Sequence, residues 1–409
     1  MKTDLYDLAI VGAGASGIFA AITAARRGCC VVLIEHTEQI GKKILSTGNG
    51  RCNFSNSMQA PACYRSSSSD ACFKVIEAFD SDRLQAFFHE MGMLVTDKEG
   101  YLYPATLSSA TVLDLFKMEL EQLKVKIKTN TKLHTITKKQ DVFSLVTDTG
   151  FEMKAKNVLL STGSKAASFT GSDGSGYELA QSFGHTIIPV VPALTGIEST
   201  DPFFRHIPKL RFDGSISVWI EDECVGEEAG QLQLSDYGIS GIAAFQLSRF
   251  ASYALTKKQK VKMRISFVMM EASKLQQELE SVAKQRANLP ARKFLVGFID
   301  SKLVIPVLQR LKIDSKKKVE EITSEEIQAI IQFLTEAEFE VSRTRNFRDA
   351  QVCAGGVSLE EISLDRMESK FVEGLYLAGE VLDVDGICGG YNLQWAFSSA
   401  YVAASHLRL

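Results

Sequence analysis

A glycine-rich segment near the N-terminus is the first pattern in this sequence that suggests chemistry. Gly12-Ala13-Gly14-Ala15-Ser16-Gly17 is a G-x-G-x-x-G that directly follows a short apolar run, Tyr6 to Val11. The first glycine permits a tight turn, the second lets the backbone approach a pyrophosphate, and the third lets a helix pack closely on a strand. We therefore expect a phosphate-binding turn whose cofactor contacts are Gly12, Gly14, Ala15, Ser16 and Gly17.

The elements around this turn have the order that a dinucleotide-binding unit needs. Ile18 to Arg27 predicts a helix, Gly28 ends it, and Cys30 to Ile34 predicts the next buried strand. Glu35 directly follows that strand, at a position where a carboxylate can accept hydrogen bonds from a ribose. The helix directs its positive end at the phosphates. This order predicts a dinucleotide site with Glu35 on the ribose and His36 near the adenine, and it leaves FAD and NAD both open.

A second polar loop lies at residues 41–53, with the sequence GKKILSTGNGRCN. It combines glycines, cations and small hydrogen-bonding groups, so its backbone can approach a flat ring. A cation beside the pyrimidine end of a flavin stabilises the reduced anionic form. The alternative interpretation is a solvated loop with exposed lysines. The flavin interpretation predicts cofactor contacts at Lys42, Lys43, Thr47, Gly48, Asn49, Gly50, Arg51, Cys52 and Asn53.

Here the chain resembles a known family, because the loop sequence is similar to the signature of the BaiN/YhiN-like flavoproteins. These are often labelled the aminoacetone oxidase family of FAD-binding enzymes. Residues 367–396, MESKFVEGLYLAGEVLDVDGICGGYNLQWA, resemble that family's closing motif. The resemblance implies FAD in a Rossmann-type domain built from both ends of the chain. The contacts it implies are Thr162, Gly163, Gly379, Glu380 on the ribitol, Asp385, Gly390, Tyr391, Asn392 and Leu393.

One motif departs from the family pattern. The central motif, usually Ala-Thr-Gly-Gly, is here Ser161-Thr162-Gly163-Ser164. A serine can replace the second glycine only if the backbone angles at that position are ordinary. The departure leaves the detail of that contact open and does not affect the choice of cofactor.

The resemblance also implies an activity, because family members are linked to reducing uridine in ribosomal RNA and double bonds in steroid-like molecules. We expect an FAD-dependent oxidoreductase that passes hydride from reduced flavin to an activated double bond. The first candidate substrate is a uracil ring in ribosomal RNA, which would give dihydrouridine. The alternatives are a steroid-like enone, the oxidation of an amine, and a non-catalytic RNA-binding protein that contains FAD. NAD(P)H is the expected donor, docking transiently because no second G-x-G-x-x-G is present.

The catalytic group is not identified by the sequence. Tyr391 is a weak candidate for a proton donor, and Cys52 and Arg51 are weak candidates because they lie in the flavin-side loop. The eight cysteines form no C-x-x-C pair, which argues against a redox dithiol or a zinc site. We expect no metal.

Composition limits the class of protein. Hydrophobic residues make up 45% and charged residues 23%, as in an ordinary globular protein. No apolar run approaches the length that a membrane-spanning helix needs, so no membrane association is expected. The N-terminal apolar run leads into the glycine turn and does not resemble an export signal. Together with the cysteine pattern, this predicts a cytoplasmic protein.

The middle of the chain does not continue the alternation of strands and helices. Short alternating runs between Lys124 and Ala155 predict a small antiparallel ribbon. The fold class is α/β: a Rossmann-type FAD-binding domain, as in flavoproteins with two dinucleotide-binding domains, with an inserted mixed-β or barrel-like region and a helical subdomain. The expected divisions are residues 1–191 and 343–409 for the FAD-binding domain, 192–272 for the mixed-β insert and 273–342 for the helical subdomain.

Positive charge is concentrated in the insert. Residues 249–318 hold 17 Lys and Arg against five Asp and Glu, a local excess of 12 positive charges. The total is −3, so the rest of the chain carries about 15 net negative charges. A basic insert is the electrostatic footprint of a polyanionic substrate such as RNA, and no DNA is expected. The alternative is a solvated helical surface, with a small molecule as substrate.

Overall fold

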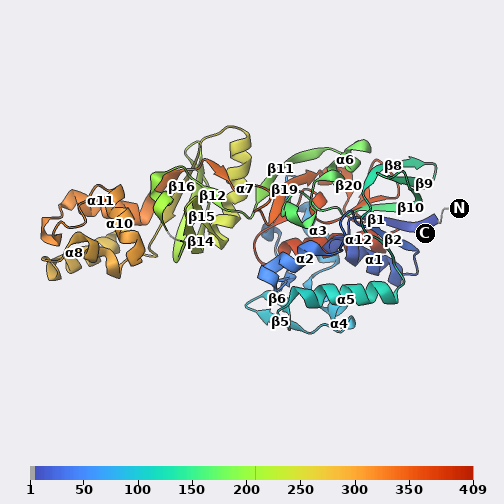
Figure 1. The fold of residues 1–409 in the computed structure, drawn as a ribbon, viewed down its shortest axis with the longest axis horizontal. Coiled ribbons are helices and arrows are strands. Elements are labelled where there is room, and N and C mark those ends of the chain that lie inside the picture. The colour runs from blue at the N-terminus through green and yellow to red at the C-terminus, as the bar shows by residue number, and fades with distance from the viewer. Residues whose placement is uncertain (1–4, 208, 409) are drawn as a thin grey trace. The chain divides into compact units, whose positions relative to one another are not determined.

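The computed structural model describes residues 5–207 and 209–408. The chain divides into two compact units, Met1–Val191 with Gln351–Leu409, and Pro192–Ala350. Figure 1 shows the consequence for the first unit, in which blue N-terminal and red C-terminal segments lie in one body. The finer division of the insert at residue 272 stays a prediction.

The centre of the first unit is a largely parallel sheet. Among the described residues it has nine strands, in the order β20-β21-β22-β10-β1-β2-β7, with β9 beside β10 and β8 beside β9. The pairs β22–β10, β10–β1, β1–β2 and β2–β7 are all parallel. The strands are β1 (Leu5–Val11), β2 (Val31–Ile34), β7 (Lys126–Lys128), β8 (Leu133–Lys139), β9 (Val142–Thr147), β10 (Glu152–Leu160), β20 (Ile362–Ser363), β21 (Glu368–Ser369) and β22 (Leu375–Leu377).

Two helices from opposite ends of the sequence pack against each other beside this sheet, α1 (Ala15–Arg26) and α12 (Tyr391–Ser405). Small residues on α1 let the helices approach, and Phe19 and Phe397 fill the contact with ring centroids 5.0 Å apart. Both rings are fully buried. Burying an aromatic ring of this size stabilises a fold by roughly 1.5–3 kcal/mol. The first unit therefore depends on an apolar contact between the two ends of the chain.

The antiparallel ribbon differs in one part from the sequence prediction. Leu133–Lys139, Val142–Thr147 and the start of Glu152–Leu160 do pair as antiparallel strands. The first predicted piece, Lys126–Lys128, instead lies parallel to β2 at the edge of the main sheet. The alternation of Lys and Ile in this segment is compatible with pairing either to the ribbon or to β2, so its partner depends on the tertiary structure. β10 belongs to both arrangements, because its end continues between β1 and β22.

Smaller elements surround the main sheet, and two of them, β3 and β6, matter for the site below. They pair antiparallel, with Asn56 opposite Tyr101. The elements are α2 (Lys42–Ser46), β3 (Ser55–Asn56), β4 (Tyr64–Arg65), α3 (Phe73–Ala78), α4 (Ser81–Glu90), β5 (Val95–Lys98), β6 (Tyr101–Pro104), α5 (Ser109–Gln122), α6 (Ser175–Ser182), β11 (Ile187–Ala193), β19 (Val352–Val357) and β23 (Asp385–Gly386).

The second unit combines a sheet with a group of helices, both visible in Figure 1. Its described residues form a seven-stranded sheet in the order β17-β16-β13-β14-β15-β12-β18, antiparallel throughout. Buried and half-buried residues alternate along β16, as expected for a sheet with one covered face. The strands are β12 (Ile197–Glu198), β13 (Leu210–Ile220), β14 (Glu223–Ser235), β15 (Gly238–Gly241), β16 (Val261–Ser266), β17 (Ala337–Glu340) and β18 (Arg343–Thr344).

The helix α7 (Ile242–Thr256) packs on this sheet, and further helices follow β16. These are α8 (Ala272–Gln285), α9 (Ala291–Phe294), α10 (Ser301–Arg310) and α11 (Ser324–Glu336). Within the described ranges, no helix has both the length and the apolar character that crossing a membrane requires.

Candidate functional site

The three glycines of the N-terminal turn have different surroundings. A Cβ added to Gly17 would lie 1.9 Å from the carbonyl oxygen of Gly12, and one added to Gly12 would lie 2.6 Å from that of Ser161. A Cβ added to Gly14 would meet no atom within 4 Å. The first and third glycines are therefore required by the fold, whereas the second borders open space.

This open space lies at the start of α1. Gly14 is the N-cap residue, no side chain caps the helix, and no acidic residue occupies its first turn. The leading N–H groups of α1 therefore face a site that favours an anion. The arrangement fits the diphosphate of a dinucleotide such as FAD.

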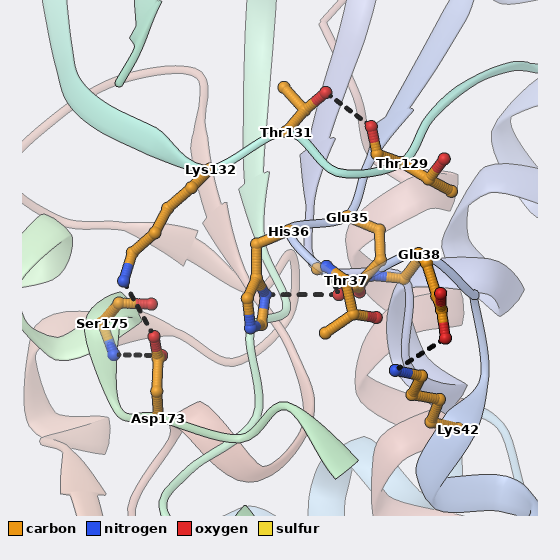
Figure 2. Close-up of polar contacts among 12 residues, drawn as sticks. Glu35, His36, Thr37, Glu38, Lys42, Thr129, Thr131, Lys132, Asp173 and Ser175 are labelled. Atoms are coloured by element: carbon orange, nitrogen blue, oxygen red, sulfur yellow. Dashed lines mark hydrogen bonds and ion pairs between the residues drawn. The ribbon is translucent and has the colours of Figure 1, made fainter. Parts of the chain in front are cut away.

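Glu35, drawn with His36 and Thr37 in Figure 2, is hydrogen-bonded to this turn. One carboxylate oxygen accepts a hydrogen bond from the Ala13 backbone N–H (3.0 Å). The other accepts from the Thr37 N–H (2.8 Å) and lies 3.2 Å from Nδ1 of His36. Burial alone would raise the pKa of Glu35, but these hydrogen bonds outweigh it and hold the pKa below its usual value. A carboxylate offers about four acceptor positions, so the ionised Glu35 keeps about one for a ribose hydroxyl.

His36, Lys132 and Asp173 are drawn near Glu35 in Figure 2. The hydrogen bond to Glu35 raises the pKa of His36 above its usual value, against the effect of burial. Lys132 Nζ lies 3.1 Å from Asp173, and the Ser175 N–H donates to the other oxygen of Asp173. Lys132 and Asp173 were not predicted as site residues. The turn Asp173-Gly174-Ser175-Gly176, which precedes α6, was the signal that could have revealed Asp173.

The loop 41–53 is held in a compact conformation. It contains α2 and a 3-10 turn, Thr47–Gly50, in which Gly48 and Asn49 have φ of 56° and 54°. Cys52 is fully buried with φ of 57°, and its N–H donates to the carbonyl of Thr47. Burial raises the pKa of the Cys52 thiol to about 11. A thiol that stays protonated is a poor nucleophile, so Cys52 is placed to pack the loop.

An ion pair joins this loop to the C-terminal motif. Lys43 Nζ lies 2.6 Å from Oε2 of Glu380, a residue 337 positions further along the chain. The other oxygen of Glu380 accepts from the Cys353 N–H (2.9 Å). Both partners of the pair are about one-fifth to one-quarter exposed, so the pair borders the surface. Lys42 instead lies 4.0 Å from Glu38, and Arg51 is exposed.

Glycines of the C-terminal motif pack against the N-terminal segments. A Cβ on Gly379 (φ 78°) would lie 2.5 Å from Ser16 Oγ, and one on Gly390 (φ 96°) would lie 2.4 Å from the Ser55 carbonyl. Gly390 is the N-cap residue of α12, again with no capping side chain. The closing motif thus brings a second uncapped helix start into the same unit as the phosphate turn.

Tyr391 and Asn392 are engaged within the protein. The Tyr391 hydroxyl donates to the carbonyl of Met58 (3.0 Å), and burial raises the pKa of Tyr391 above its usual value. The Asn392 side chain accepts from the N–H of Gly386 and donates to its carbonyl, both at 2.8 Å. Tyr391 stays protonated, but its proton is used to fix the segment around Met58.

The central motif has ordinary geometry at its unusual serine. Gly163 has φ of 71°, whereas Ser164 lies outside the left-handed region, as a serine in place of the second glycine requires. Ser161 Oγ donates to the carbonyls of Val11 and Gly12, at 3.1 and 2.9 Å. Thr162 lies under α6, since a Cβ on Gly176 would be 1.8 Å from its hydroxyl oxygen. This motif therefore supports the phosphate turn directly.

All predicted cofactor-binding residues lie in the first unit, from the turn 12–17 to the start of α12. The contacts above join the turn 12–17 to Glu35 and to the central and C-terminal motifs, and join the loop 41–53 to the C-terminal motif. Their individual contacts with FAD stay predictions.

Comparison with known proteins identifies the family. The profile described as HI0933-like protein Rossmann domain matches residues 6–406. The chain belongs to this family. It is 38% identical over 399 residues to the 3-dehydro-bile acid delta(4,6)-reductase of Clostridium scindens, covering 97% of both chains. It is 28% identical over 401 residues to the ribosomal RNA dihydrouridine synthase of Haemophilus influenzae, covering 97% of this chain and 96% of that one.

Among solved structures, a 3-ketosteroid-delta4-(5alpha)-dehydrogenase from Rhodococcus jostii is 12% identical, with a TM-score of 0.47. The match covers 99% of this chain and 98% of that one, but it is too distant to bear on function. Family membership confirms the resemblance, the Rossmann-type α/β fold and FAD as cofactor. The protein is an FAD-dependent oxidoreductase, which excludes the alternative of a non-catalytic RNA-binding protein.

Proposed function

We propose that this protein is a reductase of carbon–carbon double bonds conjugated with a carbonyl, and that its substrate is a small enone-type molecule. The observation that carries this proposal is the 38% identity, over 97% of both chains, to a relative named as a bile acid reductase. The relatives named as RNA dihydrouridine synthases are 28% identical. This ranks the small molecule ahead of the uracil ring that we first expected.

The two named substrates share one chemistry. A 3-dehydro-delta(4,6) bile acid has double bonds conjugated with a ketone, and the double bond of uracil that becomes saturated in dihydrouridine is also conjugated with a carbonyl. Reduction adds a hydride to the carbon remote from the carbonyl and a proton to the adjacent carbon. Bound FAD would supply the hydride, and NAD(P)H is the donor we propose for its reduction.

The chain's own residues would hold and orient the cofactor. The uncapped start of α1 at Gly14 would bind the diphosphate, and Glu35 would accept a ribose hydroxyl. The pair between Lys43 and Glu380 fixes the loop 41–53 against the C-terminal motif. Orientation of this kind lowers the barrier by placing the reacting atoms before the chemical step.

A uridine in ribosomal RNA is the second candidate, favoured by exposed cations in the second unit. Lys257, Lys258 and Lys260 are all exposed, as are Arg292 and Lys293. Phosphate contacts by such side chains give affinity without sequence readout.

Other basic residues of the stretch 249–318 are neutralised. Lys262 lies 3.1 Å from Glu338, Lys317 lies 2.7 Å from Glu326, and Lys318 lies 3.3 Å from Glu320. This part of the basic stretch therefore supports the alternative in which the stretch is an ordinary solvated helical surface and does not bind RNA.

The proposal is tested with purified FAD-loaded protein under anaerobic conditions, with NADH or NADPH as reductant. A 3-keto-delta(4) steroid should gain two hydrogens, as seen by mass spectrometry. A structured RNA is tested in parallel by mapping dihydrouridine. If the flavin is reduced but neither substrate gains hydrogen, the proposal is wrong. If only the RNA is reduced, the second candidate replaces it.

A further inference from the structure

Exposed aromatic and apolar side chains gather beside the turn that precedes α12. Met58 is 69% exposed and Tyr101 is 37% exposed, although most large apolar side chains of this unit are buried. Tyr103 lies on the same face of β6 as Tyr101, because alternate residues of a strand point to the same side. We call these three residues the tyrosine wall: Met58, Tyr101 and Tyr103.

The tyrosine wall is in contact with the turn at Gly389. A Cβ built on Gly389 would lie 3.1 Å from the Tyr101 ring and 3.1 Å from the Tyr391 ring. The Asn56 side chain donates to the Gly389 carbonyl at 3.1 Å. The wall therefore stands directly beside the uncapped start of α12, where the family resemblance places the flavin.

The backbone that carries the wall is fixed. The Met58 N–H donates to the Asn56 side chain (2.9 Å), and the Met58 carbonyl accepts from the Tyr391 hydroxyl (3.0 Å). Asn56 in turn pairs with Tyr101 across the two strands. Because this backbone is held, the positions from which the exposed side chains project are set before a ligand binds, and little backbone entropy is lost on binding.

The chemistry of the wall suits flat apolar rings. Tyrosine presents a large rigid face with a polar tip, and methionine adapts its shape to a partner. Burial raises the pKa of Tyr103, while the nearby charge of Arg51 opposes the rise. The Tyr103 hydroxyl therefore stays protonated at neutral pH and can donate a hydrogen bond to a carbonyl.

We infer that the tyrosine wall receives the face of a flat, polycyclic enone and so determines which substrates are reduced. This inference rests on the proposed function, because it assumes that an enone is reduced beside the start of α12. It goes further in assigning selectivity to side chains that lie in none of the flavin-binding motifs.

The test compares two substrates that share the enone. One is a 3-keto-delta(4) steroid, and the other is cyclohex-2-enone, which lacks the additional rings. In the variants Met58→Ala and Tyr101→Ala, the KM for the steroid should rise by about tenfold, the usual effect of truncating an apolar side chain at the centre of a binding surface. The kcat should change little, because the lost contact serves binding alone. Turnover of cyclohex-2-enone should be unaffected. Tyr101→Phe should retain the wild-type KM, since the ring face makes the contact.

Met118→Ala is the matched control, because Met118 on α5 is 63% exposed and lies outside the wall. Flavin absorbance of every variant establishes equal FAD content before kinetics. If the wild type reduces the steroid and neither wall variant changes its KM, the inference is wrong. The same holds if the variants impair only the reduction of RNA uridine, because the wall then stacks on a base. If the wild type reduces neither enone, the proposed function itself fails.

Discussion

The two units use their distinctive residues in different ways. In the first unit, residues expected to hold FAD also hold the fold: Gly17 touches the turn it belongs to, and Gly379 touches Ser16. In the second unit, distinctive charges such as Lys257 and Lys316 lie exposed on a sheet-and-helix core that packs without them. The first unit therefore tolerates little change at its motifs, whereas the surface of the second unit can change its charge without losing its core.

This difference separates two kinds of selectivity. Part of the cofactor site is tied to backbone positions that the core requires, such as Gly12 and Gly17, whereas Gly14 borders open space and can change without loss of the fold. We propose that the choice of substrate depends instead on exposed side chains: the tyrosine wall for an enone or, under the RNA alternative, the cations of the second unit. Relatives named for a bile acid and for ribosomal RNA are compatible with such a division.

The largest effect is expected at the glycine turn and tests whether fold and cofactor can be separated there. Gly17→Val should prevent folding, because its Cβ would overlap the Gly12 carbonyl. Gly14→Val should fold, because its Cβ meets no protein atom, but should purify without flavin because the side chain fills the phosphate cradle. Circular dichroism and flavin absorbance measure the two outcomes. A yellow Gly14→Val protein would show that the diphosphate lies elsewhere.

A smaller loss is expected at Glu35. Glu35→Gln keeps the size of the side chain but removes the charge that strengthens its hydrogen bonds to a ribose hydroxyl and to the turn, worth roughly 1.5–3 kcal/mol. FAD affinity should fall by about tenfold or more, measured by flavin fluorescence. An unchanged dissociation constant would remove Glu35 from the ribose site and weaken the view that this unit couples fold and cofactor.

If the exposed cations of the second unit bind RNA, replacing them should weaken RNA binding without affecting the flavin. In the variant with Lys316, Lys317 and Lys318 changed to Gln, RNA binding should weaken and its salt slope should fall by about 0.9 for each phosphate that is no longer neutralised. FAD content and steroid reduction should persist.

Lys317→Gln is the matched control for that variant. Lys317 pairs with Glu326, which also accepts from the N–H of Thr323 at the start of α11. The single change should lower thermal stability slightly and leave the salt slope almost unchanged. Equal RNA binding by wild type and triple variant would exclude an RNA role for this cluster.

The smallest effect concerns two histidines of the first unit whose pKa values shift in opposite directions. The hydrogen bond to Glu35 raises the pKa of His36. The pair therefore stabilises the fold fully below about pH 6.5, the pKa of an unperturbed histidine. This contribution is lost as the pH rises through the raised pKa of the folded state. Burial lowers the pKa of His185, so that residue costs stability as the pH falls below about 6.5.

Melting temperatures across pH 5–9 would distinguish the two histidines. His36→Gln should lose stability mainly at the acidic end, and His185→Gln should flatten the acid loss that the wild type shows. A His36 variant with a pH profile identical to that of the wild type would argue against the ion pair with Glu35.

The order of neighbouring residues was enough to predict the local features of this protein. The strand, glycine turn, helix, second strand and Glu35 follow one another directly along the chain, and backbone geometry at that range depends on neighbouring residues. The start of α12 after Gly389-Gly390 was predictable for the same reason. The ordinary backbone at Ser164 also followed from its residue type.

Contacts between distant segments became apparent only in the folded structure. It placed Lys126–Lys128 in the main sheet, joined Lys43 to Glu380, and gave Lys317 a structural partner. It also showed that Gly14 borders open space while Gly17 does not. A short motif specifies the conformation of its own backbone, but its neighbours in space are fixed by how the whole core packs. Residues 337 positions apart can therefore form one site that no local pattern describes.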